Sequence, residues 1–270
     1  MIGLIEEHEK KAFVGIWSQA FGDTQEYVHR FLTLSGATNY VYREDGRVLG
    51  IVSVFDVTAN GKKGGYIYAL AVEKNHRGRG IASRLLEYVD RTLVNQGFSF
   101  ALVVPEPYDA LKSFYNSRGF DNEIHLSTTE LEKTEQNSDF EIQKTTSKEI
   151  FNIWKSRKST VCHGESFFNY VCNDLTNDGA HLVKISNDNQ SAFCICHNKA
   201  DCVIINEITG CKSVADISQA IMKAFFADKA IYVSLDGTQK HSYALLKKYD
   251  LNFCNELYAN FLLDGFENRL

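Results

Sequence analysis

Proline is scarce in this sequence. Only 2 of the 270 residues are prolines, and both of them, Pro105 and Pro107, follow an apolar run at 101–104 that is predicted to be a buried strand. Because proline has no backbone N–H group, these residues are expected to end the hydrogen-bond ladder of that strand. They should also stiffen the approach to the helix predicted after them.

Cysteine is missing from the first half of the chain, since all 7 cysteines lie between residues 162 and 254. An odd number in a chain of this length does not indicate a disulfide framework. Cys194, Cys196 and His197 form a cluster of metal-ligating type, but structural zinc sites usually separate paired cysteines by two to four residues. A strand would place Cys194 and Cys196 on one face, so we expect buried reduced thiols and no metal.

Long apolar runs and a strong excess of charge are absent as well. No run approaches the roughly 18 residues of a membrane span, and the first residues soon become charged, so neither a membrane anchor nor a secretory signal is expected. The net charge of -5 argues against nucleic acid or an anionic membrane as the main partner. A cytoplasmic protein is therefore predicted, with a charge that is compatible with an amine substrate.

The length of 270 residues suits two domains of ordinary size. Residues 127–138 lose apolar content and collect charge, and the latter part of this stretch is predicted to be a linker. We place the domains at 1–135 and 136–270.

The most informative stretch runs from Gly65 to Ala82. Its first part, 65–73, alternates like a buried strand, a basic glycine-rich turn follows at 75–80, and an apolar stripe at helical spacing begins at Ile81. The first N–H groups of a helix lack partners and carry the positive end of its dipole, and glycines let the main chain close on an anion. The stretch therefore predicts a site for a phosphate or diphosphate.

Two common phosphate loops do not fit this turn. The pattern G-x-G-x-x-G fails because Gly78 and Gly80 are followed by Ser83, and no Gly-Lys-Ser/Thr is present for a nucleoside triphosphate loop. What remains, 77–82, fits Arg/Gln-x-x-Gly-x-Gly/Ala. In this turn the sequence resembles the GNAT superfamily of acyl-CoA N-acyltransferases.

A second family motif lies downstream. The pattern Tyr-x-x-x-Gly-Phe is present as Tyr115, Gly119 and Phe120, whereas Tyr108 and Leu111 stand where many members carry Asn and Ala. The two motifs have the order and spacing of the family and cover most of the first half. The alternative is a strand, turn and helix selected for packing alone, with Arg77 and Arg79 as solvated charges.

The resemblance implies an α+β fold with a mixed, splayed central sheet flanked by helices, and acetyl-CoA as co-substrate. The pantetheine arm would lie in the gap between the splayed strands and the diphosphate on the basic turn. Tyr115 would protonate the departing thiolate, or else it packs as an ordinary buried tyrosine. The implied coenzyme-binding residues are Leu70, Ala71, Val72, Arg77, Gly78, Arg79, Gly80, Ile81, Ala82 and Ser83.

The predicted function is transfer of an acetyl group to a primary amine of a small molecule by direct attack. A protein or peptide amine as acceptor, or an inactive acyl-CoA sensor, are the alternatives. The sequence does not identify the general base, for which the candidates are Glu106, Asp109, Tyr66, Tyr68, a water chain and the carboxylate of Leu270. A homodimer is possible but is not indicated by the sequence. Trp17, Phe21 and Tyr27 on two N-terminal helices either line the acceptor pocket or belong to the core.

The second half is predicted to repeat the first in degenerate form. A hairpin at 181–197 matches that at 39–57, and Tyr243–Tyr249 matches Ala110–Tyr115. Where the phosphate turn should recur, 209–216 offers one glycine and no arginine, so a GNAT-like domain without the coenzyme is expected. Similar tandems occur in relatives of the enhanced intracellular survival family, which carry a further C-terminal domain.

Overall fold

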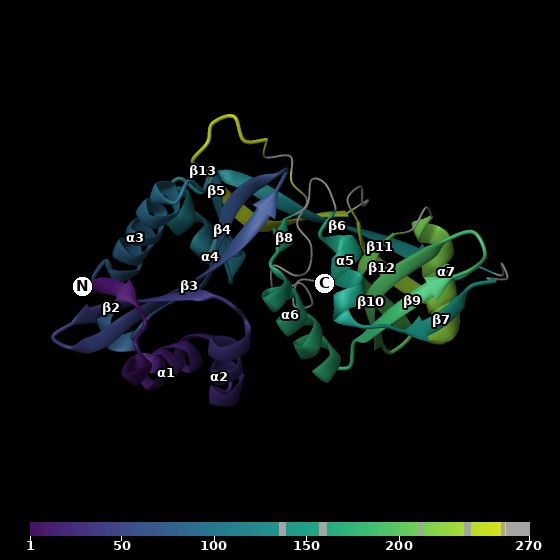
Figure 1. The fold of residues 1–270 in the computed structure, drawn as a ribbon, viewed down its shortest axis with the longest axis horizontal. Helices are drawn as coiled ribbons and strands as arrows, with labels where there is room; N and C mark the ends of the chain where they lie inside the picture. The colour runs from purple at the N-terminus through teal and green to yellow at the C-terminus, as the bar shows by residue number, and fades with distance from the viewer. Residues whose placement is uncertain (135–138, 157–160, 211–212, 235–238, 255–256, 258–270) are drawn as a thin grey trace. The chain divides into compact units, whose positions relative to one another are not determined.

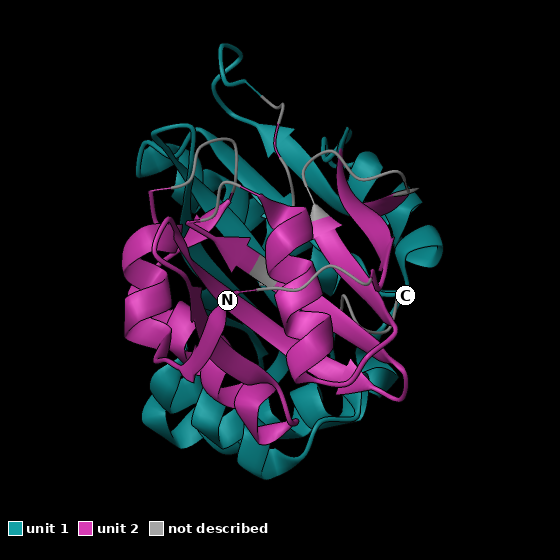
Figure 2. Cartoon of the chain, turned by 90° about the vertical axis from the view of Figure 1, so that its right-hand side faces the viewer, with its two compact units in different colours: residues 1–123, 244–255 teal, residues 124–243, 256–270 magenta. Residues whose placement is uncertain are grey.

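The computed structural model describes residues 1–134, 139–156, 161–210, 213–234, 239–254 and 257. These residues form two compact units (Figure 2). Unit 1 takes in the described residues of 1–123 and 244–255, and unit 2 those of 124–243 and 256–270. The predicted domain boundary between residues 135 and 136 lies outside the described residues. Each unit includes one strand from the other half of the sequence.

Unit 1 contains the predicted helices and strands of the first half in the predicted order, together with β1, η1 and η2, which were not predicted (Figure 1). They are β1 (Ile2–Leu4), η1 (Glu7–Glu9), α1 (Lys10–Phe21), α2 (Gln25–Leu34), β2 (Thr38–Glu44), β3 (Arg47–Ala59), β4 (Lys62–Val72), η2 (Lys74–His76), α3 (Ile81–Asn95), β5 (Phe100–Val103) and α4 (Tyr108–Asn116). Two further strands, β6 (Asn122–Glu132) and β13 (Gln239–Lys248), each have residues in both units.

The sheet of unit 1 has the strand order β1-β2-β3-β4-β5-β13. The pairs β1–β2, β2–β3 and β3–β4 are antiparallel. The pair β4–β5 is parallel, and β13 is antiparallel to β5. Helices α1 and α2 lie on one side of this sheet and α3 on the other (Figure 1). A mixed sheet flanked by helices is the predicted fold class, which is confirmed.

Two element boundaries differ from the sequence pattern, in which Asp23 followed by Glu26 indicates a helix start and the glycines and lysines of 60–65 indicate a flexible turn. The cap of α2 is Thr24, whose hydroxyl accepts from the Tyr27 N–H, whereas Asp23 accepts from the indole of Trp17 at 2.7 Å. Residues 60–65 were expected to be a flexible loop, but β4 begins at Lys62. Asn60 and Gly61, both with left-handed φ, turn the chain so tightly that the lysines already belong to the strand.

Helix α3 packs closely on the sheet. Its predicted apolar stripe is buried, as the exposures of Ile81, Leu85, Leu86, Val89 and Leu93 show. A Cβ atom at Gly50 on β3 would lie 2.8 Å from the Ile81 side chain, so only glycine allows this approach. The contact fixes the first turn of α3 against the sheet.

Strands β4 and β5 stay paired over a short length. Gly64–Ile67 pair with Phe100–Val103, and β4 then continues to Val72 while β5 ends. Within this continuation the pairing of β4 with β3 shifts register, and Ala69 has a left-handed φ of 50°, which marks a β-bulge. Among the described residues, no strand therefore lies beside the second half of β4 on the β5 side.

Unit 2 contains the remaining helices and strands. They are β7 (Glu141–Lys144), α5 (Ser147–Trp154), β8 (Cys162–His163), α6 (Glu165–Asn177), β9 (His181–Ser186), β10 (Ser191–Lys199), β11 (Cys202–Thr209), α7 (Val214–Ala224) and β12 (Lys229–Ser234). Its sheet has the order β7-β9-β10-β11-β12-β6, with β11 and β12 parallel and the other neighbours antiparallel. This order matches that of unit 1 strand for strand, so the predicted repeat is confirmed.

The last strand of each sheet comes from the other half of the sequence. Leu245 of β13 pairs with Val103 of β5 in unit 1, and Thr129 of β6 pairs with Tyr232 of β12 in unit 2. The predicted match of 243–249 to the helix at 110–115 is therefore wrong. Residues 243–246 are fully buried, and a short run that is apolar on both faces suits a central strand as well as a helix.

Cys194 and Cys196 are buried, reduced cysteines on β10, as predicted. In the described part of the chain, no group of three or more His, Cys, Asp or Glu side chains could hold a metal ion.

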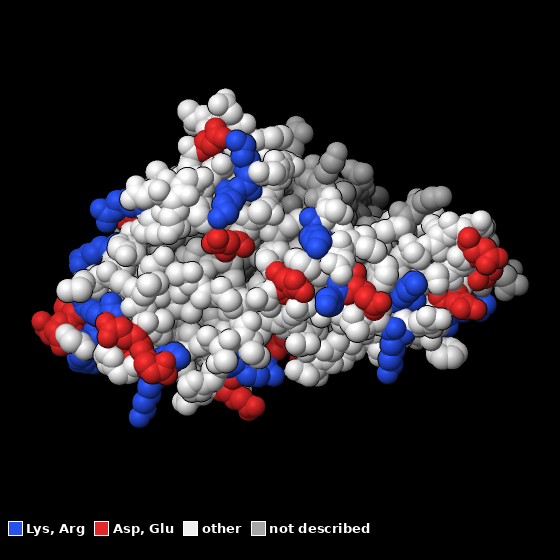
Figure 3. All heavy atoms as spheres, in the orientation of Figure 1, with Lys and Arg blue, Asp and Glu red and all other residues white. Residues whose placement is uncertain are grey.

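None of the described helices combines the length and apolar character needed to cross a membrane. Both basic and acidic side chains are scattered over the face seen in Figure 3, among broad areas that carry neither.

Candidate functional site

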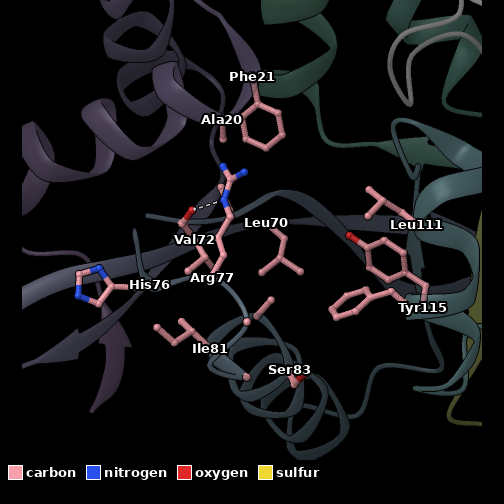
Figure 4. Close-up of a pocket in the computed structure, with 15 residues that line it drawn as sticks. Ala20, Phe21, Leu70, Val72, His76, Arg77, Ile81, Ser83, Leu111 and Tyr115 are labelled. Atoms are coloured by element: carbon pink, nitrogen blue, oxygen red, sulfur yellow. Dashed lines mark hydrogen bonds between the residues drawn. The ribbon is translucent and has the colours of Figure 1, made fainter. Parts of the chain in front are cut away.

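Unit 1 contains a cavity of about 570 Å³ between β4, the first turn of α3, α4 and the end of α1 (Figure 4). All predicted site residues except Arg79 line it, and five further residues join them. The lining residues are Ala20, Phe21, Leu70, Ala71, Val72, His76, Arg77, Gly78, Gly80, Ile81, Ala82, Ser83, Leu111, Phe114 and Tyr115.

The N-terminus of α3 opens into this cavity. Gly80 is its N-cap and has no side chain to cap the helix, and the first intrahelical bond runs from the Arg84 N–H to the Gly80 carbonyl. The N–H groups of Ile81, Ala82 and Ser83 therefore have no partner among the described residues. Gly78 and Gly80 both have left-handed φ, with open space where a Cβ atom would stand. The turn thus presents free donors at the positive end of a helix dipole.

Arg77 adds a cation to the same wall. Its Nε atom donates to the carbonyl oxygen of Val72 at 3.1 Å, a bond across the turn that orients the guanidinium (Figure 4). The structure describes no partner for its two terminal nitrogens. They remain free to bind an anion in the cavity.

Arg79 turns away from the cavity. Its Nη2 atom lies 2.6 Å from Oε1 of Glu44, and this bond holds the pKa of the Glu44 carboxyl below its ordinary value. The sequence alone does not show which of the two arginines faces the cavity, because Glu44, the partner of Arg79, lies on a strand that is distant in the chain.

His76 was not predicted as a site residue, although it directly precedes the motif. Its Nδ1 atom is hydrogen-bonded to Glu73, and this bond lowers the pKa of the Glu73 carboxyl. The pair ties down η2, the short connection between β4 and the glycine turn. Its position next to Arg77 is the one sequence signal that could have placed His76 at the cavity.

Tyr115 lies on α4, and its hydroxyl points into the cavity on the other side of Leu70 from Arg77 (Figure 4). The residue is 6% exposed, and burial raises the pKa of its phenol well above the ordinary value. The ring contacts Phe114 edge-on at 5.1 Å and Phe120 at 5.9 Å between centroids. The phenol is therefore held in place and stays protonated at neutral pH.

The end of α1 forms a further wall of the cavity. Phe21 lines it and is 46% exposed, whereas Trp17 is buried and packs against Phe31 and Tyr68. Tyr27 is half-buried and does not line the cavity. Of the three N-terminal aromatics considered, Phe21 alone faces the site and Trp17 belongs to the core.

The four predicted candidates for the general base that the structure describes do not line the cavity. Glu106 and Asp109 are exposed, Tyr66 is buried, and Tyr68 stacks on Phe31. Leu270 lies outside the described residues. The titratable side chains among the described lining residues are those of His76, Arg77 and Tyr115.

The corresponding helix of unit 2 begins differently. The hydroxyl of Ser213 caps α7 by accepting from the Asp216 N–H at 3.3 Å, and Asp216 adds a carboxylate to the first turn. Both features oppose an anion at this helix end. Residues 211 and 212 of the matching turn lie outside the described residues.

Solved structures of similar fold cover nearly the whole chain. A protein from Enterococcus faecalis V583 described as a probable N-acyltransferase is 13% identical with a TM-score of 0.76, over 93% of this chain and 72% of that one. Eis1 from Mycobacterium abscessus is 9% identical with a TM-score of 0.68, over 93% and 74%. A tandem GNAT protein from the clavulanic acid biosynthesis pathway is 8% identical with a TM-score of 0.54, over 92% and 98%.

No curated protein sequence matches the chain. The family model of the acetyltransferase (GNAT) family matches residues 4–120, which include every residue that lines the cavity. The strand order of unit 1, its open β4 and its uncapped α3 agree with that match. Residues 4–120 of this chain therefore form a domain of the acetyltransferase (GNAT) family.

Proposed function

We propose that this protein is an N-acetyltransferase that transfers the acetyl group of acetyl-CoA to a primary amine of a small molecule. The observation that carries the proposal is the shared cavity, which contains both the uncapped α3 N-terminus with Arg77 and the hydroxyl of Tyr115. The helix N-terminus and Arg77 can bind a diphosphate, and the hydroxyl of Tyr115 can protonate a thiolate leaving group.

The walls of the cavity suit an extended thioester carrier. The amides of the turn and first helical turn, Gly78 to Ser83, would hold the diphosphate with the guanidinium of Arg77, and Arg79 would contribute its main chain to that turn. The unpaired edge of β4 at Leu70, Ala71 and Val72 would bind the pantetheine arm. Unit 2 would take no coenzyme, because Ser213 and Asp216 occupy the matching helix end.

Acetyl-CoA supplies an acetyl group that is activated as a thioester. Tyr115 stays neutral because of its burial, so it can donate a proton to the departing sulfur. A main-chain N–H of the open strand can stabilise the charge that develops on the acyl oxygen. An amine that attacks the acyl carbon directly needs no covalent enzyme intermediate, and none of the lining residues is a cysteine.

Two measurements test this proposal together. Calorimetry with acetyl-CoA should show saturable binding, and a thiol-release assay over a panel of primary amines should show turnover with at least one small amine. Turnover on peptides alone would move the acceptor to a protein amine. Binding without turnover on any amine or peptide would favour a sensor, and no binding would overturn the proposal.

A further inference from the structure

Arg118 connects two walls of the cavity without lining it. It follows α4, and its guanidinium reaches the first turn of α3, where Nη2 donates to the hydroxyl of Ser83 at 2.6 Å. Nη1 donates to the carbonyl of Phe114 at 2.5 Å and to the Ser117 hydroxyl at 2.9 Å. The side chain of Arg118 is thereby bonded both to the first turn of α3, where the diphosphate is proposed to bind, and to α4, the helix that bears Tyr115.

The same guanidinium also fixes an aromatic ring of the cavity. Its central carbon lies over the ring of Phe114, 3.9 Å from the ring centroid, which is a cation–π contact. Phe114 in turn meets the ring of Tyr115 edge-on. A continuous series of contacts therefore runs from Ser83 through Arg118 and Phe114 to the phenol.

The charge of Arg118 is not neutralised by a neighbour. Among the described residues no carboxylate forms an ion pair with it, in contrast to Arg43 and Arg79. Burial raises the pKa of the Tyr115 phenol, and the positive charge of Arg118 acts in the opposite direction. The cation therefore makes loss of the proton from a buried phenol less costly.

We propose that Arg118 is a positioning residue for acetyl transfer, which holds the α4 helix and its Tyr115 at a fixed spacing from the α3 turn. The inference rests on the proposed function, since it assigns Arg118 to the same reaction. A thioester bound by its diphosphate at one end reaches the proton donor at the other only if this spacing is kept. Arg118 sets the spacing through its bonds to Ser83 and Phe114.

Lysine cannot replace arginine in this role. A guanidinium has a planar fork of donors that serves two acceptors while its face stacks on a ring, whereas an ammonium is a point charge on a flexible stem. Arg118→Lys keeps the charge and loses the geometry. Comparison with Arg118→Gln, which loses both, separates the two contributions.

The experiment compares Arg118→Lys, Arg118→Gln, Ser83→Ala and the Arg118→Gln/Ser83→Ala double variant. Acetyl-CoA is the probe, and kcat, the KM for acetyl-CoA and the Kd from calorimetry are measured. Loss of a charge-assisted bond corresponds to about a tenfold effect or more, so kcat of Arg118→Gln should fall at least that far, with a smaller rise in KM. Arg118→Lys should recover only part of this loss. The double variant should bind acetyl-CoA no more weakly than Arg118→Gln, because Ser83 is held through Arg118.

Arg91, an exposed arginine on α3 outside the cavity, supplies the control Arg91→Gln, which should keep wild-type kcat and KM. Hydrogen exchange of the amides at 81–84 and 114–118, measured without coenzyme, should accelerate in Arg118→Gln and not in Arg91→Gln.

Unchanged kcat in Arg118→Gln, or full recovery of kcat in Arg118→Lys, would overturn the inference. If Arg118→Gln does not fold, Ser83→Ala is the deciding variant, because a wild-type kcat there would show that the bond between Ser83 and Arg118 does not position Tyr115. Failure of the wild type to bind acetyl-CoA would instead remove the proposed function, while the exchange data still report whether Arg118 joins the two walls.

Discussion

The Nε atom of Arg77 donates a hydrogen bond to the carbonyl oxygen of Val72, 3.1 Å away, across the turn between β4 and α3. This bond uses one donor of the guanidinium and leaves the two terminal nitrogens without a partner among the described residues. Arg79, two residues further on, is bound to Glu44 instead. The two arginines of one turn therefore have different structural roles.

Arg77→Ala should weaken acetyl-CoA binding by about tenfold to a hundredfold, which is the effect of removing a charged hydrogen bond to a phosphate. Calorimetry measures this change directly. Arg79→Ala is the matched control, because it removes the same charge from the same turn, and its Kd should change by less than about threefold. Equal losses in the two variants would contradict the different roles.

Tyr115→Phe should lower kcat by about a hundredfold or more, the usual effect of removing a general acid, while the Kd for acetyl-CoA stays close to wild type. The ring keeps its contacts with Phe114 and Phe120, so the fold should be unaffected. Tyr249→Phe is the control, since its hydroxyl is bonded to Asp90 and lies outside the cavity. Wild-type turnover in Tyr115→Phe would exclude the phenol from the mechanism.

Leu245→Ala should reduce the free energy of unfolding by about 2–5 kcal/mol, as expected for a large-to-small change in a core. Leu245 is fully buried in the same cluster as Tyr115 and Phe120. Leu251, which is 89% exposed, provides the control, and Leu251→Ala should change stability by about 0.5 kcal/mol or less. Urea denaturation of both variants measures the difference. Similar values would show that β13 contributes little to the core of unit 1.

The ion pair between Glu9 and Arg43 should make part of the free energy of unfolding sensitive to acid. Arg43 donates two hydrogen bonds to the Glu9 carboxylate, at 2.5 and 2.6 Å, and these bonds lower the pKa of a residue that is only 6% exposed. The unfolded chain therefore binds the proton more readily than the folded one. The stabilisation is present above the ordinary glutamate pKa of about 4.3 and is lost as the pH falls through the lowered value.

Arg43→Gln tests this prediction. The variant should lose roughly 2–3 kcal/mol at neutral pH, the contribution of hydrogen bonds to a charged group. It should also show a shallower decline in stability on acidification than the wild type. The free energy of unfolding measured by urea at several pH values gives both quantities. A decline as steep as that of the wild type would assign the acid sensitivity to other carboxylates.

The part of the cavity formed by residues 70–83 was predictable because these residues are neighbours in the sequence. Residues 70–83 form a strand end, a turn and a helix start, and glycine and arginine at fixed positions specify that geometry from neighbouring residues alone. The exchange of strands was not predictable in this way. The run 243–246 is apolar on both faces, so its periodicity does not distinguish a central strand from a buried helix. Its partner β5 is distant in the chain, as are Glu44 and Ser83 from the arginines that they bind.

The crossing of β13 into the first sheet has a consequence for the newly made protein. Leu245 belongs to the core that supports Tyr115, so a nascent chain that has passed residue 135 already contains every side chain of the cavity but lacks one strand of the wall behind it. The sheet behind the cavity is therefore incomplete until the residues of β13, Gln239–Lys248, have been synthesised. Maturation of the cavity is thus coupled in time to synthesis of a strand that lies more than 100 residues further along the chain than the last lining residue.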